Sequence, residues 1–324
     1  MKKIIALLFV SIITISLFSC TFPSNNSTDG TVNINIGVMA GPTGMGMAKL
    51  MNDNTDENAK YSFEVFSDPQ VAMPELINKS LDMLCLPTNA AANLFNKNSS
   101  VSVIAINTLG SLYLLTDENT TVNSIHDLEG KTIYTSVASS TTVPILSTIL
   151  SKNGVNATIE VEENHDALVA RVVKNEVAIA VLPEPKVSAT LKQNSKYKIA
   201  LNISEEWDKV SDNSLTMGCI VVRNEFLNTN ENAVKTFLND YKNSIEYISN
   251  PQNLDSAAEM IVNANVLPAL PIAKSALTNL SGSIVFIDGS AMKEALVDFY
   301  SVLLESMPEA IGNKLPDDSF YYDS

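Results

Sequence analysis

Hydrophobic and polar positions along the chain form repeated strand–helix units. Residues 32–39 alternate polar and apolar side chains as a strand does, and the glycine-rich turn 41–46 leads into a helical segment over 45–52. The pattern predicts further strands over 62–67, 82–87 and 101–108, with helices over 69–81 and 88–96. Short loops between apolar strands and helices indicate a mainly parallel sheet that helices cover on both faces.

The same pattern restarts after residue 117. A short helix over 125–130 ends in a glycine, and we expect strands over 131–136, 157–163 and 177–182 with helices over 139–152 and 166–174. The long apolar segment 215–223 predicts a strand that returns to the first unit. Helices are expected after it over 231–248, 254–263, 272–280 and 291–304. A second α/β unit is therefore nested inside the first.

The N-terminus has the pattern of an export signal. Lys2 and Lys3 precede an uncharged apolar run over 4–17, which is too short to span a bilayer comfortably and is typical of a secretory signal. The ending Leu17-Phe-Ser-Cys20 resembles a bacterial lipobox, so we expect a signal peptide over 1–19, a lipidated Cys20 and a polar tether over 20–31. An uncleaved anchor and an ordinary signal cut nearby are the alternatives. Each places the protein outside the cytoplasm, and the lipid is its expected membrane contact.

Composition indicates a folded body with an acidic surface. Hydrophobic residues make up 45% of the 324 residues and charged residues 18%, so a sizeable core can be buried. The 36 acidic residues outnumber the 21 basic ones, and the formal net charge of -15 argues against nucleic acid as a partner. Cys85 and Cys219 both lie in apolar segments and are expected to be buried, with a disulfide between them left open.

Several segments together resemble a known family. They are Gly41–Gly46, Asp82–Asn89, Asp127–Ile133, Ala178–Pro185 and Val221–Phe226. This combination is similar to the solute-binding lipoproteins of ABC importers, in the group with nitrate, sulfonate and thiamine-pyrimidine receptors. The resemblance extends from about Val32 to Tyr322. It implies a type II periplasmic-binding-protein fold, with two Rossmann-like lobes, mixed and mainly parallel sheets, two crossing strands and a ligand cleft between the lobes. Lobe I would span 31–117 plus 214–324, and lobe II would span 118–213.

The expected ligand site follows from the geometry of such sheets. Ligands bind beyond the carboxyl ends of the strands, where helix N-termini offer unpaired N–H groups. The three expected N-termini follow Gly41–Gly46, Thr88-Asn89 and Ser139–Thr142, and each has an ordinary turn or helix cap as its alternative. The residues that we expect at the ligand are Gly41, Pro42, Thr43, Gly44, Met45, Thr88, Asn89, Ser136, Ser139, Ser140, Thr141, His165, Glu184 and Trp207. Core packing is the alternative for Met45 and Trp207, and a surface position is the alternative for His165 and Glu184.

The absence of certain motifs narrows the function. Arg171 and Arg223 are the only arginines. Arg171 lies in an expected helix away from the cleft loops, and Arg223 follows the apolar return strand before a polar turn, which favours a neutral, aromatic or backbone-bound anionic ligand over a clamped carboxylate. No zinc, thiol-pair or nucleophile motif is present, so we expect no catalytic residue, metal or cofactor. We predict a receptor that passes a small organic or anionic solute to an ABC permease and its ATPase. The alternatives are an enzyme on the same fold, as in the menaquinone pathway, and a lipoprotein that senses a solute without transporting it.

Overall fold

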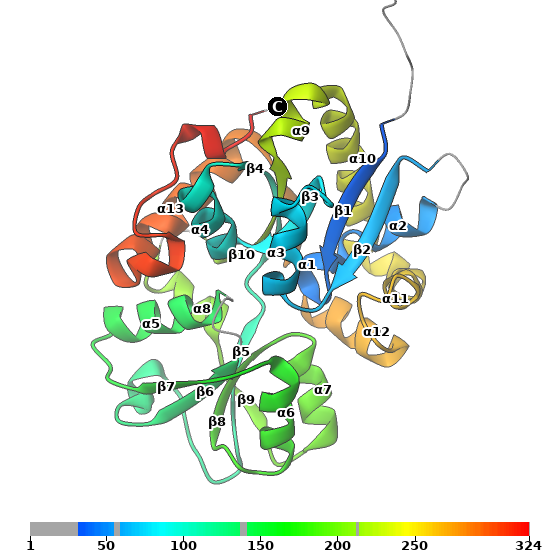
Figure 1. Ribbon diagram of the computed structural model, residues 1–324. Coiled ribbons are helices and arrows are strands. Elements are labelled where there is room, and N and C mark those ends of the chain that lie inside the picture. Colours follow the sequence, from blue (N-terminus) through cyan, green and yellow to red (C-terminus); the bar gives the residue numbers. More distant parts are fainter. Residues whose placement is uncertain (1–31, 55–58, 137–140, 212–213, 324) are drawn as a thin grey trace, which may run out of the picture. The chain divides into compact units, whose positions relative to one another are not determined.

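The computed structural model describes residues 32–54, 59–136, 141–211 and 214–323 (Figure 1). The predicted signal peptide, Cys20 and the tether lie outside these ranges, as do Ser139 and Ser140. Within the described ranges, no helix is both long enough and apolar enough to cross a bilayer.

The first sheet has six strands. Their order is β11 (Ile284–Ile287), β4 (Val101–Leu109), β10 (Thr216–Arg223), β3 (Met83–Pro87), β1 (Ile34–Met39) and β2 (Tyr61–Phe66). Strands β1 to β4 point the same way, while β10 runs antiparallel between β3 and β4, and β11 is antiparallel to β4. The apolar runs of β3, β4 and β10 are buried because helices cover both faces of the sheet.

The second sheet has five strands and repeats this design. Its order is β7 (Thr158–Glu162), β6 (Thr132–Ser136), β8 (Ile179–Pro183), β5 (Leu112–Thr116) and β9 (Lys198–Asn202). Strand β5 runs antiparallel to β8 and β9, and β6 is parallel to β7 and β8. Strand β10 in the first sheet and β5 in the second each run antiparallel to both neighbouring strands. Each is the first strand that the chain forms after it crosses from the other sheet. The predicted α/β class with mixed, mainly parallel sheets is confirmed.

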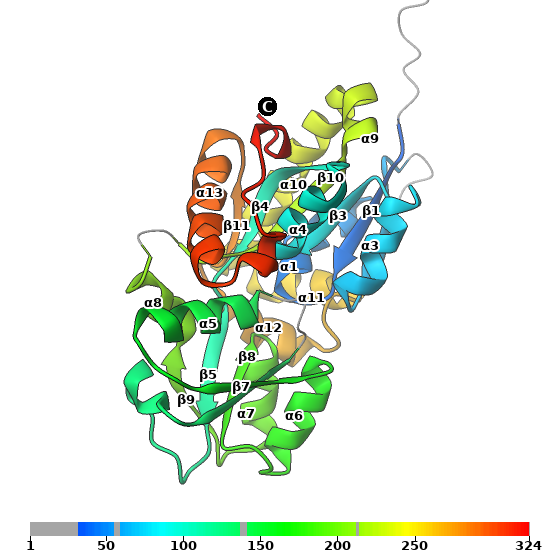
Figure 2. The same ribbon diagram turned by 60° about the vertical axis from the view of Figure 1, so that its left-hand side comes forward.

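Helices form layers on both faces of the six-stranded sheet (Figures 1 and 2). On one side lie α1 (Pro42–Met45), α2 (Ala48–Asp53), α10 (Glu231–Ser249), α11 (Leu254–Asn263) and α12 (Leu270–Asn279). On the other side lie α3 (Pro69–Ile77), α4 (Thr88–Asn98), α13 (Gly289–Ser306) and the short turn η3 (Pro308–Ile311). Their apolar faces and the sheet build the main core.

The five-stranded sheet is covered by its own helices. These are α5 (Thr142–Lys152), α6 (His165–Val173), α7 (Lys186–Gln193) and α8 (Ile203–Asp208). A short turn, η1 (Ile125–Leu128), precedes β6, and its Ser124–Asp127 capping box holds it in place. The remaining elements are α9 (Asn224–Thr229), η2 (Pro251–Asn253) and η4 (Asp318–Phe320).

The structure adds elements that the sequence pattern did not predict. They are β5, β9, β11, α7, α8 and α9. Strand β5 lies inside the range 31–117 expected for the first lobe, yet it hydrogen-bonds in the five-stranded sheet. The helix expected over 45–52 is two helices, because the chain turns at Gly46 and Met47.

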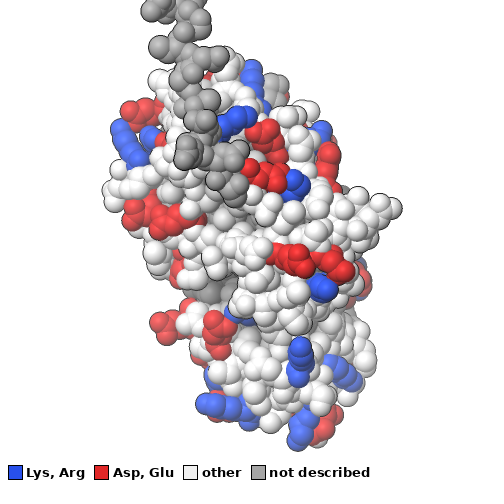
Figure 3. All heavy atoms as spheres, turned by 90° about the vertical axis from the view of Figure 1, so that its right-hand side faces the viewer, with Lys and Arg blue, Asp and Glu red and all other residues white. Residues whose placement is uncertain are grey.

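Charged side chains lie on the surface, and the two cysteines are buried as predicted. Acidic and basic side chains are interspersed on the face shown in Figure 3, with uncharged areas between them. Cys85 and Cys219 are both buried and free, which answers the open question of their pairing. Burial raises the pKa of the Cys85 thiol to about 12, so this thiol stays protonated.

Candidate functional site

A cavity of about 130 Å³ lies where the carboxyl ends of strands from both sheets come together. Met39 at the end of β1 and Pro87 at the end of β3 line it, as does Ser67 directly after β2. Pro183, at the end of β8, lines it from the five-stranded sheet. A ligand was predicted at this position, beyond the carboxyl ends of the strands.

Hydroxyl groups supply much of the polar lining of this cavity. Thr43 and Thr141 lie at the starts of α1 and α5, and Thr108 and Ser111 lie at the crossing from β4 to β5. Thr141 is the N-cap residue of α5, but its side chain makes no capping hydrogen bond. Threonine and serine hydroxyls both donate and accept, so this lining suits a ligand with mixed hydrogen-bonding groups.

Gly218 in β10 allows two of these hydroxyls to lie close together. A methyl group at this position would lie 2.9 Å from the Thr43 hydroxyl and 3.0 Å from the Thr108 hydroxyl. It would also lie 2.6 Å from the Asn107 side-chain oxygen. The cavity therefore depends on a residue without a side chain at this point of β10.

His165 is the titratable residue on the cavity wall. It is the first residue of α6, follows the N-cap Asn164, and its Nδ1 lies 2.5 Å from the hydroxyl of Ser136 at the end of β6. Desolvation, followed by the nearby Lys186, lowers the pKa of His165 to about 4, against smaller opposite effects of Asp166 and Asp68. The imidazole is therefore neutral at pH 7, with one ring nitrogen as donor and the other as acceptor.

Gly41 and Gly44 in the first loop are required by the backbone conformation and by close packing. Gly41 has a φ of 100°, a conformation that residues with side chains rarely adopt. A side chain at Gly44 would lie 2.0 Å from the backbone oxygen of Met39, so α1 closes onto the end of β1 only with glycine there. Pro42 and Thr43, between these glycines, are the residues that line the cavity.

Several residues predicted at the ligand lie elsewhere. Met45 and Trp207 are fully buried, and the Trp207 ring packs at 5.3 Å from that of Phe299 in α13, which corrects the expectation of a stacking surface. Thr88 is also buried, and its hydroxyl donates to the backbone oxygen of Thr216 at 2.9 Å rather than to a ligand. Asn89 is buried and does not line this cavity.

Glu184 is likewise engaged in an internal network. It is 1% exposed and accepts hydrogen bonds from the Ser188 hydroxyl at 2.9 Å and from the Asn279 side-chain nitrogen at 2.8 Å. Because Ser188 belongs to α7 and Asn279 to α12, this carboxylate joins helices that cover different sheets. It does not line the cavity, and its contact with a ligand stays a prediction.

Both arginines are paired away from the cavity. Arg171 bonds to Glu162 and lies over the Tyr134 ring, and Arg223 pairs with Asp82 at 2.7 Å. The described cavity wall therefore has no Arg or Lys side chain. A bidentate clamp for a carboxylate is not available from these residues.

The site residues predicted from the sequence include only Pro42, Thr43, Thr141 and His165 of the cavity wall. Ser67, Thr108 and Ser111 follow or end strands of the first sheet, so a search for hydroxyls at strand ends would have found them. Met217 comes from the start of the antiparallel strand β10, and the Ser111 hydroxyl lies 3.6 Å from its sulfur. Its position at the cavity depends on β10 lying between β3 and β4, and this strand order cannot be predicted from the local sequence.

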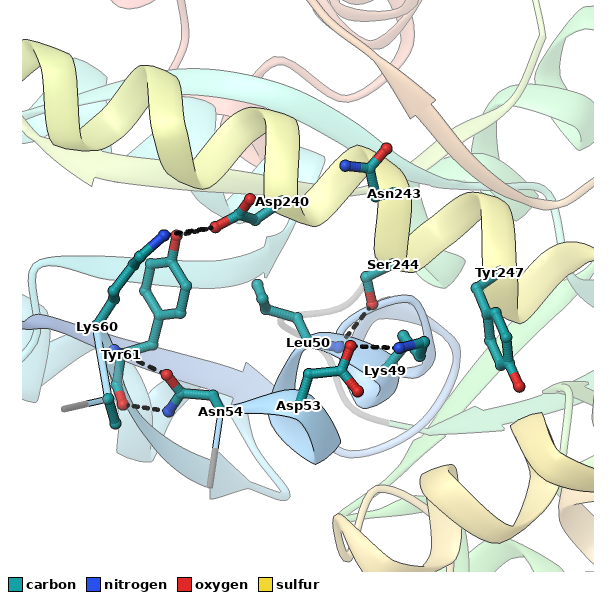
Figure 4. A pocket seen from close by; sticks show the side chains of 11 residues that line it. Lys49, Leu50, Asp53, Asn54, Lys60, Tyr61, Asp240, Asn243, Ser244 and Tyr247 are labelled. Carbon is teal, nitrogen blue, oxygen red and sulfur yellow. Dashed lines mark hydrogen bonds and ion pairs between the residues drawn. The ribbon is translucent and has the colours of Figure 1, made fainter. Parts of the chain in front are cut away.

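A larger pocket of about 440 Å³ lies outside this cleft, between α2, the start of β2 and α10 (Figure 4). Its charged groups are paired with one another. Lys49 bonds to Asp53, while Asp240 accepts from Tyr61 at 2.7 Å and lies 3.7 Å from Lys60. Because these charges are already satisfied, the pocket is a weaker candidate than the smaller cavity.

Residues 45–301 match the family described as VitK2_biosynth, menaquinone biosynthesis. The chain belongs to this family. No curated protein matches the sequence. Among the described residues, no group of three or more His, Cys, Asp or Glu could hold a metal ion.

Solved structures with the same fold include proteins named as parts of ABC transport systems and as solute-binding proteins. An ABC transporter protein from Parabacteroides distasonis is 19% identical, with a TM-score of 0.76 over 90% of this chain and 99% of that chain. The aliphatic sulphonate binding protein SsuA from Escherichia coli is 14% identical, with a TM-score of 0.72 over 90% and 92%. The nitrate-binding protein NrtA from Synechocystis PCC 6803 is 11% identical, with a TM-score of 0.62 over 86% and 81%. The resemblance to this receptor group is confirmed at the level of the fold.

Proposed function

We propose that this protein is an extracytoplasmic solute-binding lipoprotein that captures a small polar solute and passes it to an ABC permease and its ATPase. One observation carries the proposal: the cavity at the carboxyl ends of both sheets is lined by hydroxyl groups and a neutral imidazole. Such a lining binds a ligand by hydrogen bonds and releases it again, because it forms no covalent or metal bond. The solute that it favours is neutral, or anionic and held by hydroxyl and N–H groups.

Release would require the two sheets to separate, as in other hinged receptors. The chain passes from β4 to β5 through Gly110 and Ser111, and it returns from β9 through α8 to β10. Away from these connections, the Thr148 hydroxyl lies 2.6 Å from that of Ser306, and Lys152 lies 2.8 Å from Glu305. The exposed ion pair contributes only about 0–1 kcal/mol, but separation would also break the hydrogen bond from Asn279 to the buried Glu184 and the packing of Trp207 on Phe299.

The remaining parts of the proposal come from the N-terminal pattern and from the resemblance. Export by a signal over 1–19, lipidation at Cys20 and a tether to residue 31 would hold the receptor at the membrane. Lobe I would take residues 31–117 and 214–324, and lobe II 118–213, except that β5 joins the sheet of lobe II.

The test is thermal unfolding of the protein against a panel of sulfonates, nitrate, pyrimidines, other vitamin precursors and amino acids. A ligand at one hundred times its dissociation constant adds about 2.7 kcal/mol to the free energy of unfolding, which raises the midpoint by several degrees. We expect Thr108→Val to reduce the shift and Thr236→Val, at an exposed position on α10, to leave it unchanged. Equal shifts in wild type and Thr108→Val would remove the cavity from the proposal.

An enzyme is the second candidate, and two observations favour it. The family is described by menaquinone biosynthesis, and His165 with Ser136 forms a neutral imidazole–hydroxyl pair at the cavity. A neutral imidazole can accept a proton from a bound compound, as a general base does. Conversion of a bound compound, lost in His165→Gln while binding persists, would favour the enzyme over the receptor.

A further inference from the structure

A second, more apolar groove of about 530 Å³ lies between α3 and α4. On α3 it is lined by Gln70, Met73, Pro74 and Ile77, whose spacing of three, four and seven residues places them on one face of the helix. Over this length α3 rises about 10 Å. The groove therefore follows the helix from its first turn to its last.

The opposite wall and the base of the groove mix apolar and polar side chains. Ala90 and Leu94 line it from α4, and Met307 and Ala310 line it from the region of η3. The polar and charged residues that line it are Asn89, Asn93, Lys97 and Glu309. Pro144, in the first turn of α5, closes it from the helix that covers the other sheet. The apolar part of this surface favours a hydrocarbon group that leaves water.

The groove adjoins the polar cavity at the starts of three helices. On α3, Pro69 lines the cavity and the next residue, Gln70, lines the groove. On α5, Thr142 lines the cavity and Pro144 lines the groove. Pro87, directly before α4, lines the cavity, while the start of α4 lines the groove. The residues that line the two spaces are therefore adjacent in the chain at three places.

The two spaces differ in volume. The polar cavity, at about 130 Å³, is below the roughly 300–1,000 Å³ typical of pockets for small organic ligands, whereas the groove, at about 530 Å³, is within that range. The cavity alone holds a compact headgroup. A larger ligand must extend beyond it, and the groove is the adjoining space.

An unsatisfied polar atom marks the junction. Asn89 lines the groove at the first turn of α4 and is 5% exposed, and its side-chain oxygen has no hydrogen-bond partner. This oxygen is shielded from water, so a donor on the ligand reaches it only when the Asn89 side chain turns towards the groove.

We infer that the ligand is an amphiphile, with its compact polar headgroup in the cavity of Thr43, Thr108 and His165 and its apolar chain in the groove between α3 and α4. This inference rests on the proposed function and specifies the class of solute. It also gives a role to Ile77, a large apolar side chain that is 52% exposed on α3.

The test compares alkane-1-sulfonates and alkanamides of two, six and ten carbons by titration calorimetry, below the concentrations at which they form micelles. We expect affinity to rise with chain length by up to about fourfold for each methylene that is buried. Ile77→Glu should weaken binding of the ten-carbon compounds at least tenfold and leave the two-carbon compounds unchanged. Val71→Glu is the matched control, because Val71 is 62% exposed on the same helix but does not line the groove.

Each outcome decides the inference. Affinity that is independent of chain length, or equal losses in Ile77→Glu and Val71→Glu, would overturn the groove as a ligand site. Binding of the two-carbon compounds alone would leave the receptor function standing without the groove. If neither series binds at all, the amphiphile inference fails, and the solute panel tests the receptor function separately.

Discussion

Replacing His165 should remove a specific part of the dependence of stability on pH. The pKa of His165 is lowered to about 4 in the folded protein, from 6.5 in the unfolded chain, chiefly by desolvation and then by Lys186. Between these values the unfolded chain binds more protons than the folded protein. The free energy of unfolding therefore falls as the pH drops from 6.5 towards 4, and it is unaffected by this group above that window.

The size of this effect follows from the two pKa values. Between pH 7 and pH 5, protonation of His165 in the unfolded chain costs the folded protein at most about 2 kcal/mol, at 1.36 kcal/mol for each pKa unit. In His165→Gln this loss is absent, so the variant should be less sensitive to acid than wild type by that amount. Urea unfolding at both pH values, with matched slopes, measures the difference.

The chain offers one matched control for this measurement. His126 is the other histidine, and it is exposed in η1, away from the cavity. His126→Gln should keep the pH dependence of wild type. The reasoning is refuted if wild type and His165→Gln lose the same free energy of unfolding between pH 7 and pH 5.

Three other changes test the packing around the site. Trp207→Ala should lower the free energy of unfolding by about 3–5 kcal/mol in urea because it empties a fully buried position, and a loss below 1 kcal/mol would contradict this. Asp82→Asn should cost about 3 kcal/mol in the same assay because Arg223 loses its partly buried partner, whereas an unchanged midpoint would show that the pair is not stabilising. Gly218→Ala should weaken ligand binding at least tenfold in calorimetry, since its methyl group displaces the Thr43 hydroxyl, and wild-type affinity would show that this hydroxyl is not needed.

The central strands and most helices could be predicted because their patterns are long. Parallel strands that are buried on both faces have continuous apolar runs, as in 103–106, and a helix such as 231–248 repeats its apolar residues every three or four positions. Strands β5, β9 and β11 have only four or five residues. Other strands of five residues, such as β3 and β8, were predicted, so length alone does not explain the omission. Strands β9 and β11 lie at the edges of their sheets, and β5 follows β4 after only Gly110 and Ser111.

The candidate site was predictable in its position but only in part in its residues. Thr43, Thr141 and His165 lie within five residues after the ends of β1, β6 and β7, where ligands bind in open sheets, so they could be predicted. Trp207 and Glu184 follow the same kinds of elements, but contacts with α13 and α12 bury them. These contacts join segments about ninety residues apart in the chain and leave no local pattern in the sequence.

The central claim is that the cavity binds a small molecule reversibly and leaves it unchanged. Its most direct test is mass spectrometry of the compound released when the purified protein is denatured, followed by titration of that compound back into ligand-free protein. The fluorescence of Trp207, the only tryptophan, would follow the titration, because its ring packs on Phe299 of α13, a helix that covers the other sheet. The account predicts one saturable site and full recovery of the unaltered compound. Chemical conversion of the compound, or no saturable binding of any compound, would contradict it.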